Sequence, residues 1–146
     1  MCIRDSDIPV WVPETCIQCN QCSFVCPHAA IRPYLANSAD LALALAAMPA
    51  SLQGKNALGK EFAGLQYFIQ VSPLDCTGCG NCVQVCPAKP KPLVLKNLEQ
   101  VLPEEENKFN FLECLPEVQV VFDHSTVKNS QFKKPLFEYS LSLIHI

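Results

Sequence analysis

The pattern CxxCxxCxxxCP occurs twice in this chain, at residues 16–27 and again sixty residues later at 76–87. The two segments read CIQCNQCSFVCP and CTGCGNCVQVCP, and six of their twelve positions are identical. The shared residues are the four cysteines, one valine and the final proline. Eight of the ten cysteines therefore belong to an internal repeat, and whatever these thiols hold must shape the fold.

Three kinds of site can use clustered cysteines. Disulfides explain the pattern poorly, because four thiols within eleven residues favour no obvious long-range pairing. Structural zinc usually takes two CxxC pairs that lie far apart, rather than a CxxCxxC triplet with a fourth cysteine after three further residues. The third kind is a pair of [4Fe–4S] clusters, and two complete copies of the motif favour it strongly.

The spacing has a physical reason in the shape of a cubane cluster. Two residues between successive cysteines let the chain wrap the cluster and place three thiolates on three irons. The fourth cysteine, which we expect at the start of a short helix, then reaches the cluster of the other half. The predicted ligands are Cys16, Cys19, Cys22 and Cys86 for one cluster, and Cys76, Cys79, Cys82 and Cys26 for the other.

Each motif is flanked by short apolar segments. Residues 8–12 and 67–71 have the composition of strands before the motifs, and residues 29–31 and 93–95 are candidate return strands. Each half then reads strand, cysteine loop, short helix, strand. We therefore expect an α+β fold of the bacterial two-cluster ferredoxin-like type, with a pseudo-twofold repeat.

Two further segments surround this repeat. Leu41, Leu45, Met48 and Leu52 follow helical spacing and predict an apolar helix face within an insertion at residues 33–65. Pro103, followed by three glutamates, predicts the start of a helix that ends at Pro116. Residues 123–140 are polar and without periodicity, which indicates an extended connector.

A few other residues near the motifs carry weaker signals. Gly78 and Gly80 either let the backbone approach the cluster and donate N–H groups to its sulfurs, or simply form turns. We expect Cys114 to be a small buried apolar residue, and His28 to be a surface or packed histidine rather than a group that tunes the cluster. His124 has no evident partner. No residue set for hydrolysis, phosphate binding or paired-carboxylate catalysis is recognised, so no catalytic residue is predicted.

Composition narrows the class of protein. The formal charge is −3 and 17% of residues are charged, which argues against nucleic acid as the main partner. The hydrophobic fraction of 49% excludes a disordered chain. The longest apolar run, residues 41–50, is much shorter than the roughly 18 residues of a membrane span, so no membrane insertion is expected.

The two ends of the chain have an unusual relation. One DNA string that encodes the first six residues, MCIRDS, has a reverse complement that encodes the last six, LSLIHI. We therefore expect residues 1–6 and 141–146 to derive from a sequencing adapter, with an internal fragment of a longer protein between them. The predicted division is a 4Fe-4S ferredoxin-type domain at residues 7–102 and a helical and extended connector at 103–140.

Three segments together resemble one enzyme family. WVPETCIQCNQCSFVCPHAAIRPYL, FIQVSPLDCTGCGNCVQVCPAK and TVKNSQFKKPLFEYS are similar to pyruvate:ferredoxin (flavodoxin) oxidoreductases, and the resemblance covers residues 7–140. It implies that the eight motif cysteines bind the two outer clusters of such an enzyme. The parent reaction would convert pyruvate and coenzyme A to acetyl-CoA, carbon dioxide and reduced ferredoxin.

The resemblance also implies what lies elsewhere in the parent enzyme. Thiamine diphosphate, Mg²⁺ and a third [4Fe–4S] cluster would belong to parts absent from this chain, so the fragment would relay electrons without turning over substrate. The implied partners are ferredoxin or flavodoxin and the remaining domains of a homo-oligomeric enzyme. Reduced thiols and exposed clusters indicate an oxygen-avoiding cytoplasm. Two alternatives remain open: a free-standing ferredoxin-like carrier, and a subunit of another 2-oxoacid oxidoreductase.

Overall fold

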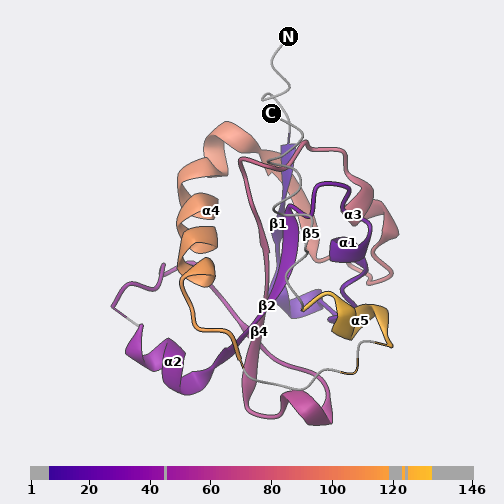
Figure 1. The fold of residues 1–146 in the computed structure, drawn as a ribbon. Helices are drawn as coiled ribbons and strands as arrows, with labels where there is room; N and C mark the ends of the chain where they lie inside the picture. Colours follow the sequence, from indigo (N-terminus) through magenta and orange to yellow (C-terminus); the bar gives the residue numbers. More distant parts are fainter. Residues whose placement is uncertain (1–6, 45, 119–122, 124, 133–146) are drawn as a thin grey trace, which may run out of the picture.

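Two small antiparallel sheets organise the computed structural model, which describes residues 7–44, 46–118, 123 and 125–132 (Figure 1). In the first sheet, β1 (Asp7–Trp11) pairs with β5 (Leu93–Asn97). In the second, β4 (Leu65–Val71) lies between β2 (Ile31–Asn37) and the two-residue β3 (Lys55–Asn56). The fold is thus a small α+β structure, as the sequence predicted.

The predicted strands are all present, with shifted boundaries. The segments at 8–12, 67–71 and 93–95 correspond to β1, β4 and β5. The return strand expected at 29–31 instead begins at Ile31 and continues to Asn37, because its full length pairs with β4. This strand therefore reaches into the range predicted as an insertion.

Strand β4 is buried on both of its faces. Tyr67, Ile69 and Val71 belong to a core cluster on the side of the cysteine motifs, whereas Phe68 packs against Leu112 on the opposite side. This alternation follows from the period of two in a strand. In Figure 1, α4 (Leu98–Glu113) lies on one side of the strands, with α1 (Gln21–Phe24) and α3 (Asn81–Val85) on the other.

The start predicted for the acidic helix at Pro103 is wrong. Helix α4 begins five residues earlier at Leu98, and the side chain of Asn97 caps it by accepting a hydrogen bond of 3.1 Å from the Glu99 N–H. Pro103 lies inside the helix, where it lacks the N–H that would bind the Glu99 carbonyl. The end near Pro116 is confirmed, since α4 stops at Glu113.

The long helix predicted from the spacing of residues 41–52 is also wrong. Helix α2 spans only Ser38–Leu43, and residues 46–52 form turns, while Leu45 lies outside the described residues. Pro49 disfavours helical backbone at Met48, which explains part of this difference. Leu41, Met48 and Leu52 nevertheless pack on the same core cluster as Phe68, so the apolar contact is made without a continuous helix.

Part of the expected extended connector folds back onto the domain. Helix α5 (Val127–Ser130) is capped by Thr126, whose hydroxyl accepts a hydrogen bond of 3.2 Å from the Asn129 N–H. Figure 1 shows α5 close to α1. The adapter-like ends, His124 and residues 133–140 lie outside the described residues. Among those described, no helix is long and apolar enough to cross a membrane.

Candidate iron–sulfur centres

The first of two small cavities brings together cysteines from both motifs. Three of them come from the first motif and one from the second: Cys16, Cys19, Cys22 and Cys86. Trp11, Tyr67 and Ile69 line the apolar wall of this cavity.

The second cavity contains the complementary set. Cys76, Cys79 and Cys82 of the second motif line it together with Cys26 of the first. Ile31 and Val71 contribute the apolar wall on the side of the sheet. Both quartets predicted from the sequence are therefore gathered, each around its own cavity.

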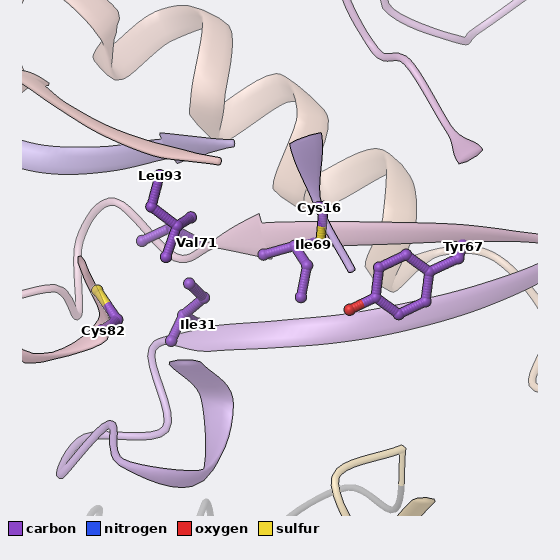
Figure 2. Packing of buried hydrophobic residues seen from close by; sticks show 7 residues of the cluster. All are labelled: Cys16, Ile31, Tyr67, Ile69, Val71, Cys82 and Leu93. Carbon is purple, nitrogen blue, oxygen red and sulfur yellow. The ribbon is translucent and has the colours of Figure 1, made fainter. Parts of the chain in front are cut away.

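A row of apolar side chains connects the two cavities through the core (Figure 2). Cys16 lies on the side of Ile69 and Tyr67, and Cys82 lies on the side of Ile31 and Val71. All nine cysteines within the described part of the chain are free thiols.

The prediction that the fourth cysteine of each motif starts a short helix is wrong. The short helices α1 and α3 contain the third cysteines, Cys22 and Cys82. Cys86 follows directly after α3 as its C-terminal cap, and Cys26 lies two residues beyond α1. The helices begin earlier because a left-handed residue precedes each one, Asn20 before α1 and Gly80 before α3.

The two cysteine loops share an unusual backbone. Gln18 and Gly78 occupy equivalent positions with φ of 58° and 68°, and Asn20 and Gly80 follow with φ of 57° and 74°. This turn points the Gln18 N–H at the Cys16 sulfur, 3.4 Å away, and the Gly78 N–H likewise binds Cys76. In both loops a backbone N–H thus points at a cysteine sulfur, and in the first loop a non-glycine residue provides it.

The side chain of Gln18 anchors the first loop to the segment between the halves. This amide is 1% exposed, donates to the Asn56 carbonyl at 2.7 Å and accepts from the Leu58 N–H at 2.7 Å. Lys55 adds a hydrogen bond of 2.9 Å to the Cys16 carbonyl. The segment that interrupts the repeat therefore supports the first cysteine loop. The sequence signal for this role is that the first motif has Gln18 at the position where the second motif has Gly78.

Asn20 links the first cavity to the C-terminal segment. Its Oδ1 accepts a hydrogen bond of 2.5 Å from the Tyr67 hydroxyl, and its Nδ2 donates to the Lys128 carbonyl at 2.7 Å. Phe132 packs on the ring of Tyr67 with centroids 6.1 Å apart. Neither Asn20 nor Tyr67 was singled out from the sequence, because their partners are distant along the chain.

Two residues with weaker sequence signals have different outcomes. His28 is exposed and lines the second cavity. Cys114 forms the C-terminal cap of α4 and is exposed, so the expectation of a buried apolar residue is wrong.

Comparison with known protein families supports this geometry. A model for the 4Fe-4S dicluster domain matches residues 15–89, which cover both cavities' cysteines. The chain belongs to this family. The dicluster domain carries two [4Fe–4S] clusters, in agreement with the cofactors predicted from the motifs.

Several oxidoreductases contain a segment that is similar to this chain. Over 92% of its length, it is 63% identical to the pyruvate:ferredoxin oxidoreductase of Moorella thermoacetica and 45% identical to the pyruvate-flavodoxin oxidoreductase of Klebsiella pneumoniae. It is also 44% identical to the pyruvate dehydrogenase [NADP(+)] of Cryptosporidium parvum over 91% of the chain. The predicted resemblance is confirmed. The chain spans 11%, 11% and 7% of these three relatives.

The environment of the thiols in the dicluster domain suits a strongly cationic group. Burial raises the pKa of Cys16 and Cys76, and raises that of Cys82 to about 11. The neighbouring cysteines add to these shifts, because bringing several thiolates together is unfavourable. A metal cluster would reverse this cost by binding the deprotonated sulfurs.

The donor set also fits iron–sulfur chemistry. Each cavity offers four sulfur ligands, which are the soft donors that Fe–S clusters take. Within the described ranges, no three histidine, cysteine or acidic side chains converge on a point suited to a single metal ion.

Proposed function

We propose that this chain transfers electrons through two [4Fe–4S] clusters with crossed ligation. Cys16, Cys19, Cys22 and Cys86 would bind one cluster, and Cys76, Cys79, Cys82 and Cys26 the other. The observation that carries the proposal is the lining of the two cavities, each of which gathers three cysteines of one motif and the fourth of the other.

The protein's contribution is to hold, shield and separate the two centres. When bound, the clusters supply one-electron redox chemistry. Cys16 and Cys82 are each 8% exposed, and the Tyr67, Ile69 and Val71 side chains exclude water from the space between the cavities. Cys79 is exposed, which brings the second centre closer to the surface.

The same proposal includes a pseudo-twofold arrangement of the domain. The first strand of each half pairs with the last strand of the other, β1 with β5 and β4 with β2. The two loops also adopt the same sequence of left-handed residues. Residues between β2 and β4 would then be an insertion into the repeat, and residues 103–140 a connector outside it.

The relatives suggest the enzyme to which this relay belongs. We infer that the chain is part of a cytoplasmic pyruvate:ferredoxin or pyruvate:flavodoxin oxidoreductase, whose other domains hold thiamine diphosphate, Mg²⁺ and a third cluster. Ferredoxin or flavodoxin would accept the electrons. Support comes from 63% and 45% identity to proteins with these names.

Metal content tests the cluster proposal directly. The chain loaded under anaerobic conditions should contain about eight iron and eight sulfide per molecule, as two [4Fe–4S] clusters require. Cys114→Ser is a matched control, because Cys114 is exposed and outside both cavities. It should leave the iron and sulfide content unchanged. Zinc in place of iron would contradict the electron-transfer proposal.

Pairs of substitutions test the crossed ligation. The low-temperature EPR spectrum of reduced Cys86→Ser should match that of Cys19→Ser, because both variants would disturb the first-motif cluster. Cys26→Ser should correspondingly match Cys79→Ser. The crossed assignment is wrong if Cys86→Ser instead shares its altered signals with Cys79→Ser.

A further inference from the structure

Trp11 stands at the end of β1 and lines the first cavity beside Cys16. Its indole ring packs edge-on against Tyr67, with centroids 6.0 Å apart and an interplanar angle of 71°. This contact fixes the orientation of the ring within the wall of the cavity.

The indole N–H of Trp11 is buried and has no hydrogen-bond partner among the described residues. A buried donor of this kind costs free energy unless something accepts its hydrogen, and tryptophan usually finds such an acceptor. The Cys16 sulfur lines the same cavity as Trp11 and belongs to the core cluster against which Trp11 packs. The Gln18 N–H already points at the same sulfur, 3.4 Å away. A neutral thiol accepts hydrogen bonds weakly, whereas a thiolate accepts them well.

The position equivalent to Trp11 in the second half of the repeat carries no side-chain donor. The residue sixty positions after Trp11 is Val71, and it lines the second cavity as Trp11 lines the first. The backbone donors, by contrast, occur in both loops, since Gln18 and Gly78 each direct an N–H to a cysteine sulfur. The indole N–H is therefore a donor of the first half that the equivalent position of the second half lacks.

We propose that Trp11 donates its indole N–H to the Cys16 thiolate and thereby raises the reduction potential of the first-motif cluster. The inference rests on the proposed function, because it requires Cys16 to bind that cluster. One added electron makes the centre more negative without moving a proton, and a hydrogen bond to a ligand sulfur stabilises that more negative state. Trp11 thus acts through Cys16 as a tuning residue.

Isotope labelling tests the contact without changing the protein. Trp11 is the only tryptophan, so indole-¹⁵N tryptophan places a single label in the full chain. In the reduced, cluster-loaded protein, pulsed EPR should detect hyperfine coupling between this ¹⁵N and one of the two clusters. The exchangeable indole proton should give a coupling that disappears in deuterium oxide.

Substitution tests the effect on potential. Trp11→Phe keeps an aromatic ring but removes the donor, so an EPR-monitored redox titration should show one midpoint potential shifted to a more negative value and the other unchanged. Tyr34→Phe is the matched control, because it removes an aromatic hydroxyl that donates to Glu113 and lies outside both cavities. It should leave both potentials unchanged.

The outcomes separate the two proposals. A wild-type chain that binds no iron and sulfide overturns the proposed function, and this inference with it. A fully loaded chain without ¹⁵N coupling overturns only the role of Trp11, as does an unchanged potential in loaded Trp11→Phe. If Trp11→Phe does not bind its clusters, the ¹⁵N coupling measured in the labelled wild-type protein still tests the hydrogen bond.

Discussion

The four left-handed residues of the cysteine loops show how one backbone can be built from different side chains. Gly78 and Gly80 adopt positive φ without steric cost, whereas Gln18 and Asn20 adopt it as L-residues with a side chain. Both side chains are 1% exposed and make hydrogen bonds with distant parts of the chain. In the first loop, the cost of this backbone is thus offset by contacts that glycine could not make.

Asn20 provides a prediction at this scale. Asn20→Ala leaves the buried Tyr67 hydroxyl without its acceptor, which costs about 1–3 kcal/mol, and places alanine in a left-handed conformation. Asn20→Gly loses the same acceptor but avoids the backbone cost of about 1 kcal/mol. We expect the denaturant midpoint for loss of cluster absorbance, measured anaerobically, to fall in both variants and to fall further for alanine.

A double substitution separates the two costs. Adding Tyr67→Phe to Asn20→Gly removes the hydroxyl that lost its acceptor, so the midpoint should partly recover. Equal midpoints for Asn20→Ala and Asn20→Gly would show that the left-handed backbone of the first loop carries no measurable strain.

At the scale of elements, local patterns predicted what local interactions determine. The spacing within each motif indicated the two cysteine loops, and the apolar segments around the motifs indicated all four main strands. The start of α4 was missed because Pro103 resembles a helix start, while the cap at Asn97 lies two residues past the strand predicted at 93–95. The docking of α5 could not be predicted, since the contact between Asn20 and Lys128 joins residues 108 positions apart.

Helix α4 is attached to β4 by a buried polar network. Glu105 accepts hydrogen bonds from Gln70 of β4 at 2.8 Å and from Lys108 at 2.9 Å. The side chains of Lys108 and Glu105 are 11% and 4% exposed. Because both charged side chains are buried away from water, each is stabilised by its ion pair with the other.

Removing the cation should therefore be strongly destabilising. Lys108→Met leaves the Glu105 carboxylate buried without its ion pair, a change that typically costs about 3–5 kcal/mol. Glu104→Gln is the control, because Glu104 binds the same lysine at 2.8 Å but is 53% exposed. An exposed pair contributes about 0–1 kcal/mol. Comparable losses of the denaturant midpoint in the two variants would contradict a buried role for Glu105.

The same network predicts a pH dependence. The hydrogen bond from Lys108 holds the pKa of Glu104 below its ordinary value of 4.5. A lowered carboxyl pKa stabilises the fold above the unfolded value and loses that effect as the pH falls through the folded value. The small difference in midpoint between wild type and Glu104→Gln should thus be constant near neutral pH and disappear in acid. A difference that grew as the pH fell would contradict the ion pair.

The whole molecule is organised around mutual dependence between its two halves. Each sheet joins a strand from the start of one half to a strand from the end of the other, and each cavity gathers cysteines from both. Two distant segments also converge on the first loop, namely residues 55–58 and α5. A cluster bound in either cavity would therefore link residues about sixty positions apart, and binding free energy would become folding free energy.

Removal of iron tests this dependence. Chelation of the loaded chain should unfold it, with loss of far-ultraviolet circular dichroism and of amide-exchange protection in β1–β5 and β2–β4 together. Both sheets should respond because each cavity wall includes strand residues, Trp11 of β1 at the first and Val71 of β4 at the second. Renewed addition of iron and sulfide should restore both signals. If β4 kept its protection without iron, its apolar core of Tyr67, Phe68 and Ile69 would be sufficient to fold the second sheet alone.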